Sequence, residues 1–269
     1  MFLGCEIGGT KLQIGIVTGR GQLRQLVRLP VDRPAGRDGI LRQFTQIIPG
    51  ILQDNQVQAI GVGFGGPVDG RRGRVVRSHQ ITGWRGFELR RWFTQQFHLP
   101  AVVENDSNCA ALAEARCGAG RGKRVVFYTN IGTGIGGGLV VDGQLYNGRY
   151  GAMELGHTRL SVGQQWPTVE ELASGLAIER GQSTVTQSAR VMGVAVANVI
   201  ALLNPDVVVI GGGVAQAGEK FFRPLRATVR RLAFAPFRGN YRIVPAAVGE
   251  SVVVVGAALL AAELVAHRR

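Results

Sequence analysis

The chain has 269 residues, of which 45% are hydrophobic and 18% charged, and it carries a net charge of +13. This length and apolar content allow one large core or two modest ones, and they exclude intrinsic disorder. No uninterrupted apolar run reaches the roughly 18 residues that a membrane-spanning helix needs, and the N-terminus has no signal-peptide pattern, so we expect a cytoplasmic protein.

The first half of the chain predicts strands that alternate with helices. Residues 2–18 have the pattern of a strand, a glycine turn and a second strand, and residues 39–52 show helical spacing of apolar side chains. Buried strands are expected at 59–66 and 101–106, with an amphipathic helix at 87–97 between them. A further helix is expected at 107–116, where a glycine ends it.

The second half repeats the opening pattern. Residues 125–145 again predict strand, glycine turn, strand and tight turn, so that Ile7-Gly8-Gly9-Thr10 corresponds to Ile131-Gly132-Thr133-Gly134. A helix near 188–203, a buried strand at 207–213 and a closing apolar segment follow; the closing segment suits a helix, although its valine run also suits a strand. The repeat predicts an α/β protein with two similar halves facing each other.

Three glycine-rich turns, at 8–10, 132–138 and 211–213, each follow an apolar strand. Such turns expose backbone N–H groups with no Cβ in the way and can hold phosphate oxygens. A single turn of this kind is ordinary hairpin structure, but three in a duplicated chain favour a phosphate site. The P-loop spacing is absent, and the G-x-G-x-x-G within 132–138 has no helix directly after it, which disfavours a dinucleotide fold.

Acidic residues end the buried strand at 101–106. A carboxylate at the carboxyl edge of a sheet faces a crevice, and phosphoryl transfer to an alcohol needs a group that accepts the hydroxyl proton. Asp106 suits this role as a base. The structural alternative is that Asp106 caps the helix that follows it.

A second polar group comprises Glu154, His157 and, further along the chain, Glu170. Two carboxylates and an imidazole can hydrogen-bond several sugar hydroxyls with defined direction. Glu-x-x-His can also ligate a metal, but no second pair of this kind supports a metal site. A lone histidine with a structural role is the simpler alternative.

The charge and the cysteines are less informative. The arginines are spread along the chain without a nucleic-acid-binding motif, so a solvated basic surface is the simpler interpretation, and attraction of a polyanionic phosphoryl donor is the functional one. Cys5, Cys109 and Cys117 form no C-x-x-C pair and are interpreted as buried, inert thiols.

Together these segments resemble the ROK family (repressor, open reading frame, kinase), whose kinase members phosphorylate hexoses. The matching segments run in family order along nearly the whole chain: EIGGTK (6–11), GVGFGGPVD (61–69), ITGW (81–84), VENDSNCAALAE (103–114), NIGTGIGGGLVVDGQLYNG (130–148), MELGH (153–157), EELASG (170–175) and NPDVVVIGGG (204–213). The resemblance implies an α/β, actin-like ATPase fold of two ribonuclease-H-like lobes with a central cleft. We expect an N-terminal lobe at 1–107, joined by the C-terminal helix at about 255–269, and a C-terminal lobe at 108–254.

The resemblance also implies roles for individual residues. Asp106 matches the catalytic base, and the sugar ligands are matched by Gly65, Gly66, Asn105, Asp106, Glu154, His157 and Glu170. The nucleotide contacts are matched by Gly8, Gly9, Thr10, Lys11, Thr133, Gly134, Gly211, Gly212 and Gly213. ATP and magnesium are the expected cofactors, with few protein ligands on the metal.

The chain departs from the family pattern in four places. Glu6 replaces the usual Asp before the first glycine turn and is expected to reach magnesium through water; around Gln80 the usual Asn before the Gly-Trp pair is replaced, so one sugar contact is expected to change. Residues 158–169 contain no cysteine, so the family's zinc loop is missing and we expect no structural zinc. The helical region after Ile178 is shorter than usual and belongs to the part that helps these proteins dimerise, so a homodimer stays open.

Three hypotheses follow from the sequence. The leading one is an ATP-dependent hexose kinase that acts on the sugar 6-hydroxyl, most simply a glucokinase. The second is a glucokinase that uses polyphosphate, and the third is a non-catalytic sugar binder or regulator. Because the chain starts directly at the first phosphate strand, no DNA-binding helix-turn-helix is expected. No membrane partner is expected, because no apolar run is long enough to span a bilayer. The identity of the hexose stays open.

Overall fold

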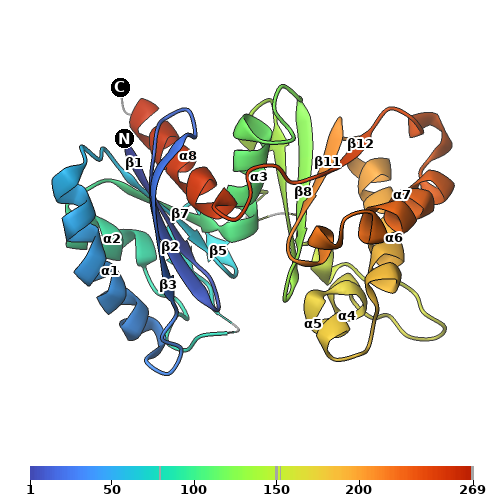
Figure 1. Ribbon diagram of the computed structural model, residues 1–269, viewed down its shortest axis with the longest axis horizontal. Helices are drawn as coiled ribbons and strands as arrows, with labels where there is room; N and C mark the ends of the chain where they lie inside the picture. Colours follow the sequence, from blue (N-terminus) through green and yellow to red (C-terminus); the bar gives the residue numbers. More distant parts are fainter. Residues whose placement is uncertain (79, 149–150, 152, 268–269) are drawn as a thin grey trace. The chain divides into compact units, whose positions relative to one another are not determined.

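The computed structural model describes residues 1–78, 80–148, 151 and 153–267. Contacts divide the chain into two compact units (Figure 1). Unit 1 comprises residues 1–113, 147–151 and 248–269, and unit 2 comprises 114–146 and 152–247. Each unit therefore draws on more than one stretch of the sequence.

Unit 1 contains a five-stranded sheet in the order β3-β2-β1-β4-β7. Strand β1 pairs antiparallel with β2 and parallel with β4, and β4 pairs parallel with β7. The sheet strands are β1 (Phe2–Ile7), β2 (Lys11–Val17), β3 (Leu23–Pro30), β4 (Ile60–Phe64) and β7 (Ala101–Asn105); the other elements are β5 (Val68–Asp69), β6 (Arg74–Val75), α1 (Gly36–Asp54), α2 (Leu89–Phe97) and α8 (Val252–Ala266). Helix α3 (Asp106–Cys117) begins in unit 1, and its residues from Glu114 on belong to unit 2.

Unit 2 repeats this topology with the sheet order β10-β9-β8-β11-β12. The first pairings are antiparallel, and β8–β11 and β11–β12 are parallel. Its elements are β8 (Val125–Ile131), β9 (Ile135–Val141), β10 (Gln144–Leu145), β11 (Val207–Gly211), β12 (Arg242–Pro245), α4 (Val169–Ala173), α5 (Gly175–Glu179), α6 (Val185–Leu203) and α7 (Glu219–Leu232), with short 3-10 turns η1 (Leu155–His157), η2 (Val214–Ala217) and η3 (Ala235–Phe237). The matching sheets explain the sequence repeat.

The two faces of the first sheet pack against different helices, and successive residues of a strand point to opposite faces. Leu3, Cys5 and Ile7 of β1 join the large core cluster with α1 and α2. Phe2 on the other face joins a cluster with Val254, Ala258 and Ala261 of α8. Burial on both faces explains why these strands are apolar at nearly every position.

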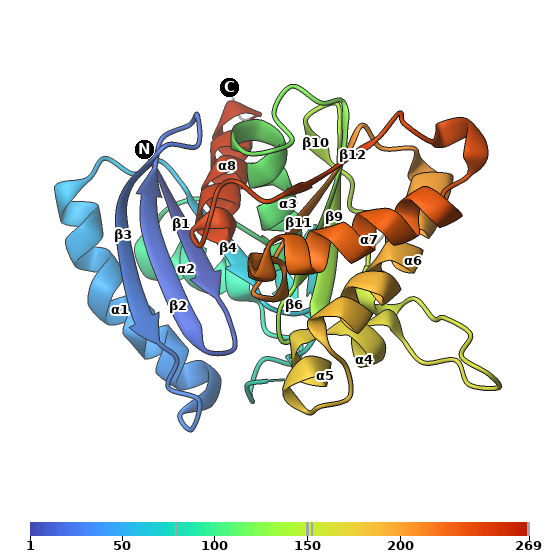
Figure 2. The same cartoon turned by 45° about the vertical axis from the view of Figure 1, so that its right-hand side comes forward.

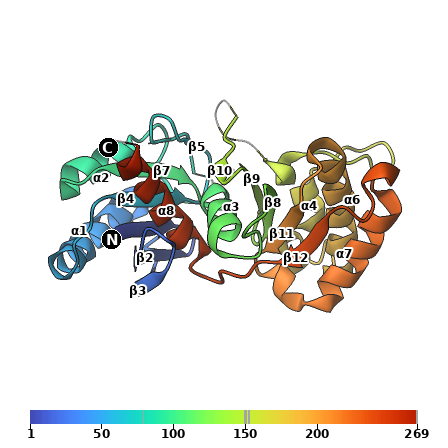
Figure 3. The ribbon, with the colours of Figure 1, turned by 90° about the horizontal axis from the view of Figure 1, so that it is seen from above.

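Glycines let α8 lie close to the sheet (Figures 1 and 3). A Cβ on Gly4 would lie 2.0 Å from the carbonyl oxygen of Val254, and a Cβ on Gly61 would lie 1.8 Å from that of Ala257. On the helix itself, a Cβ on Gly256 would lie 1.8 Å from the carbonyl oxygen of Cys109. These distances exclude any side chain, so backbone contact is what the glycines provide. The closing segment is thus a helix, and its valine run is not a strand.

Helices α6 and α7 pack together beside the second sheet (Figure 2). Met192, Val196 and Ile200 of α6 join Phe221 and Leu225 of α7 in one core cluster. By length and composition α6 could cross a membrane, although its apolar residues form no uninterrupted run of that length; it is the one such helix in the described part of the chain. Its buried face marks it as the core helix of unit 2.

Candidate functional site

In unit 1, the turn between β1 and β2 contains Gly8, Gly9 and Thr10, and Lys11 opens β2. The Gly8 N–H donates to the Lys11 carbonyl at 3.1 Å, so this amide closes the hairpin and is not available to a ligand, contrary to our expectation of unpaired N–H groups throughout the turn. The amides of Gly9 and Thr10 have no acceptor among the described residues. These two N–H groups, with the exposed Thr10 hydroxyl, are the donors that the turn can offer to a phosphate.

Asp106 and the first glycine turn are brought together by Gly65, which follows β4. The Gly65 N–H donates to the Ile7 carbonyl at 2.8 Å. A Cβ on Gly65 would lie 3.5 Å from Asp106 Oδ2 and 3.6 Å from the Cα of Gly8. The parallel pairing of β1, β4 and β7 places their carboxyl ends at one edge of the sheet, as the sequence predicted.

The start of α3 shows that Asn105, and not Asp106, caps the helix. Helix α3 begins at Asp106 itself, and Asn105 Oδ1 accepts from the Ser107 and Asn108 amides at 2.9 and 3.3 Å. Asn105 Nδ2 donates to the Gly66 carbonyl at 3.1 Å. Asp106 Oδ1 accepts from the Ser107 amide at 2.7 Å, while Oδ2 is the oxygen nearest Gly65. Asn105 therefore fixes the loop after β4 relative to Asp106, and its second amide N–H has no acceptor among the described residues.

Glu6 lies at the end of β1 and is only 7% exposed. Its Oε2 is 3.8 Å from Lys11 Nζ. Burial raises the pKa of Glu6 to about 7; the Lys11 ammonium opposes this and the Asp106 carboxylate adds to it. Burial has a larger effect on the pKa of Glu6 than the ion pair has, because Lys11 is half-exposed and solvent screens its charge.

Sequence reasoning missed a second buried carboxylate network behind this edge. Glu104 Oε1 accepts from the Asn105 amide and from Asn108 Nδ2, and Oε2 accepts from Asn147 Nδ2 at 2.8 Å. Burial raises the pKa of Glu104, and these three hydrogen bonds lower it in part. The signal was present in the sequence as a Glu beside Asn105 and Asp106, but the partner Asn147 lies far along the chain.

Two further neighbours of the first turn were not predicted as ligands. Arg33 Nε donates to the Gly9 carbonyl at 2.6 Å, and the Gln80 side chain occupies the space that a Cβ on Gly9 would fill. Both side chains are polar, and both contact the turn. Gln80, singled out as a departure at the sugar side, thus contacts the predicted phosphate turn.

In unit 2, the second and third glycine turns lie next to each other. Gly212 has φ +88°, and a Cβ there would lie 2.4 Å from the Ile131 carbonyl oxygen, so only glycine suits both the backbone and the contact. The Gly175 N–H donates to the Gly132 carbonyl at 2.7 Å. The predicted nucleotide residues Thr133, Gly134, Gly211, Gly212 and Gly213 therefore belong to one cluster of turns.

Glu154, His157 and Glu170 gather around the start of β9. Glu170 Oε2 accepts from the Ile135 amide at 2.7 Å, and a Cβ on Gly156 would lie 2.3 Å from the Ile135 carbonyl oxygen. Glu154 and His157 are exposed; Glu154 precedes η1 and His157 is its last residue, and the His157 amide donates to the Glu154 carbonyl. One oxygen of Glu170 thus holds the β8–β9 turn, while the side chains of Glu154 and His157 reach solvent.

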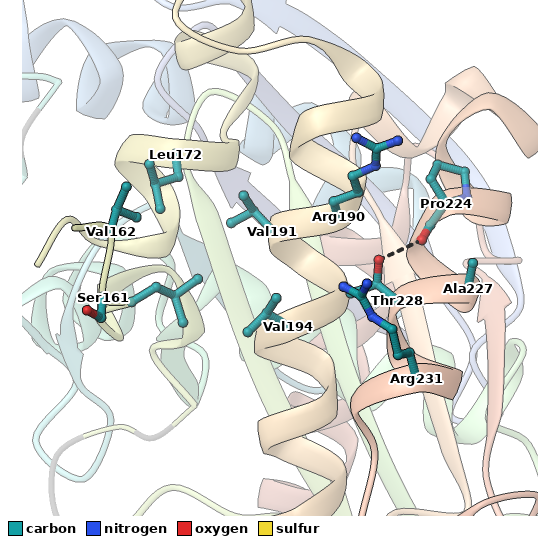
Figure 4. A pocket seen from close by; sticks show the side chains of 11 residues that line it. Ser161, Val162, Leu172, Arg190, Val191, Val194, Pro224, Ala227, Thr228 and Arg231 are labelled. Carbon is teal, nitrogen blue, oxygen red and sulfur yellow. Dashed lines mark hydrogen bonds between the residues drawn. The ribbon is translucent and has the colours of Figure 1, made fainter.

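Three other features do not contribute to this site. A cavity of about 770 Å³ in unit 2 lies among the 158–168 segment, α4, α6 and α7 (Figure 4), and none of its lining residues is a predicted site residue. Cys5 and Cys109 are buried, as predicted, and burial raises the pKa values of both thiols. Cys117 is half-buried, so the prediction of burial is wrong for it.

Comparisons with known proteins agree with one another. The sequence model of the ROK family matches residues 2–184 and 176–264. A glucokinase of Streptomyces coelicolor is 28% identical over an alignment of 319 positions, gaps included, that spans 98% of each chain. The crystal structure of a ROK hexokinase from Thermus thermophilus has a TM-score of 0.86 at 30% identity, covering 99% of both chains. That of a ROK family glucokinase from Streptomyces griseus in complex with glucose and AMPPNP has a TM-score of 0.83 at 29% identity, covering 97% of this chain and 99% of the other.

Proposed function

The chain belongs to the ROK family, has its actin-like ATPase fold and is a sugar kinase, and on that premise we propose that it transfers the γ-phosphoryl group of ATP to the 6-hydroxyl of a hexose, as a glucokinase does. The observation that carries the proposal is the Asp106 carboxylate beside Gly65, at the same sheet edge as the turn of Gly8 to Lys11. A proton acceptor and a phosphate-sized turn are the two parts that this reaction needs from a protein.

In this proposal Asp106 accepts the proton of the sugar hydroxyl as that oxygen attacks the γ-phosphorus. Gly65, Gly66, Asn105, Glu154, His157 and Glu170 orient the sugar, and the exposed side chains of Glu154 and His157 are suited to hydrogen bonds with its hydroxyls. Gly8 to Lys11, Thr133, Gly134 and Gly211 to Gly213 hold the nucleotide. The amides of Gly9 and Thr10 and the Lys11 ammonium supply positive potential for the phosphates.

The donor set near the first turn fits magnesium. The described residues contain no group of three or more His, Cys, Asp or Glu side chains that could enclose a metal, so protein ligands alone do not make a cage. Glu6, with Asp106 nearby, offers the carboxylate oxygens that magnesium prefers, and phosphate oxygens and water would complete its shell. Bound there, the metal would neutralise charge on the phosphates.

The first test measures formation of the sugar phosphate, and ADP release where ATP is the donor, across a panel of glucose, mannose, fructose, allose and N-acetylated hexosamines, with ATP or polyphosphate as the donor. We expect turnover with ATP and at least one hexose. Turnover with polyphosphate but not with ATP would show that polyphosphate, and not ATP, is the phosphoryl donor. Sugar binding without turnover for every donor and sugar would contradict the kinase proposal and favour a non-catalytic binder.

The second test removes the base. Asp106→Ala should lower kcat by about two to four orders of magnitude, because a positioned base contributes that much, while the sugar dissociation constant stays within a few-fold. Rates come from the ADP-release assay and sugar affinity from calorimetric titration. Asp54→Ala, an exposed carboxylate at the end of α1, is the matched control and should leave both values unchanged. Wild-type turnover in Asp106→Ala would exclude Asp106 as the base.

A further inference from the structure

Gln13 is a fully buried polar residue of the first sheet, on a strand whose neighbouring residues Leu12 and Ile14 are buried and apolar. It lies on β2 directly opposite Glu6 of β1, and its exposed fraction is 0%. Gly15, two residues further along β2, lies on the same face of the sheet and packs against α8. A buried amide at such a position is unfavourable unless each of its polar atoms has a partner.

Every polar atom of the Gln13 amide has a partner in the orientation that matches donors to acceptors. Nε2 donates to Glu6 Oε2 at 2.9 Å and to the Glu250 carbonyl at 3.1 Å, and Oε1 accepts from Arg28 Nε at 3.2 Å. Arg28 in turn forms an ion pair with the Glu250 carboxylate at 3.3 Å. The amide thus joins Glu6 to strand β3 and to the segment that precedes α8.

These contacts divide the two oxygens of Glu6 between different tasks. Oε2 is taken by Gln13 and by the ion pair with Lys11. Oε1 lies on the side of the glycine turn, 3.7 Å from where a Cβ on Gly8 would be. A glutamate has one more rotatable bond than an aspartate, so without Gln13 its carboxylate could take several orientations.

We propose that Gln13 is a positioning residue that holds the Glu6 carboxylate with one oxygen toward the turn of Gly8 to Lys11, ready for a divalent cation carried by the nucleotide. This inference rests on the proposed function, because it assigns a task to Glu6 within the nucleotide site. Gln13 itself contacts neither substrate nor cation. Its effect on cation binding acts through Glu6.

The test is a double-mutant cycle of Glu6→Gln and Gln13→Met, read as the affinity for Mn²⁺ in the presence of ADP. Methionine keeps the length of the glutamine side chain and removes its hydrogen bonds. Free Mn²⁺ is measured by electron paramagnetic resonance. Loss of a hydrogen bond to a charged group predicts about a tenfold weaker Mn²⁺ affinity for Gln13→Met in the Glu6 background. In the Glu6→Gln background the same substitution should change the affinity by less than about twofold.

Two controls separate positioning from a general loss of structure. Gln25→Met changes an exposed glutamine on β3 and should leave Mn²⁺ affinity unchanged. The glucose dissociation constant and the far-UV circular dichroism spectrum should be the same for Gln13→Met and the wild type. A spectrum or glucose affinity that changes together with Mn²⁺ affinity in both backgrounds would assign Gln13 a purely structural role and overturn the inference.

The outcomes also separate this inference from the proposed function. Suppose that the wild type binds Mn²⁺ with ADP and phosphorylates a hexose. If Gln13→Met then lowers the Mn²⁺ affinity equally in both backgrounds, or does not change it, the positioning role is wrong and the kinase proposal stands. If the wild type binds no Mn²⁺ with ADP and shows no turnover with any sugar, the proposed function fails first, and the role of Gln13 fails with it.

Discussion

Burial raises the pKa of both Glu6 and Glu104, but the two carboxyl groups have different surroundings. Glu104 is enclosed by amide donors from Asn105, Asn108 and Asn147, so its task is to hold the end of β7 in place. Glu6 has Gln13 and Lys11 on one oxygen and the glycine turn beside the other. At the scale of residues, the same chemical group is structural in one place and directed toward a candidate ligand site in the other.

The raised pKa of Glu6 predicts a specific pH dependence of stability. Because its pKa in the folded chain is about 7 against 4.5 for an unperturbed Glu, the folded state binds the proton more tightly, and stability is lost as pH rises through this window. Relative to Glu6→Gln, the wild type should therefore lose up to roughly 3 kcal/mol of unfolding free energy from below pH 4.5 to above pH 7. Urea unfolding of both proteins without nucleotide or metal measures this difference. A difference that stays constant with pH would contradict the buried environment assigned to Glu6.

At the scale of elements, α8 shows how glycine positions decide packing. Its backbone lies against β1 and β4 through Gly4 and Gly61, and Gly256 on the helix lies against α3. The sequence predicted α1, α2, α3, α6 and most strands close to their observed bounds, because apolar periodicity and helix ends are local signals. It assigned no element to α7 or β12. Pro224 lies within the first turns of α7, where a proline usually suggests a helix boundary.

Gly256→Ala tests the packing of α8. Its Cβ would meet the backbone of Cys109, which cannot move away as a side chain can, so we expect a loss of roughly 2–4 kcal/mol in unfolding free energy. Gly50→Ala is the matched control: it also lies in a helix, nothing lies within 4 Å of its Cβ position, and it should be neutral or stabilise by about 0.5–1 kcal/mol. Thermal and urea unfolding measure both. Equal stability of the two variants would show that α8 does not approach α3 so closely.

At the scale of the whole molecule, the two units differ in which stretches of the sequence form them. Unit 1 needs α8 from the far end of the sequence to cover Phe2, Val17 and Ala59. Unit 2 is contained in one stretch from 114 to 247, with only 147–151 assigned elsewhere. Both sheets share one strand order, yet only one of them depends on both ends of the chain.

This difference predicts the behaviour of fragments. Residues 114–247 should fold alone and unfold cooperatively, because their core cluster of β8, β9, β11, α6 and α7 is complete. Residues 1–113 should not fold alone, since the α8 face of their sheet would be exposed. Far-UV circular dichroism and thermal unfolding measure both, and adding residues 248–269 through a flexible linker should restore structure to the N-terminal fragment. A cooperative transition in 1–113 alone would refute this assignment of α8.

The sequence by itself determined the alternation of strands and helices, the duplicated strand–turn–strand pattern and the family of the chain. These features depend on residues that are close together in the sequence, as in strand periodicity, glycine turns and short motifs. Only the tertiary structure decided which groups face each other. It paired Gln13 with Glu6, Arg28 and the Glu250 carbonyl, made Asn105 the cap of α3 in place of Asp106, and set Glu170 on the Ile135 amide. A buried polar group takes whatever partner the packing of distant segments brings within hydrogen-bond distance, and no local pattern encodes that choice.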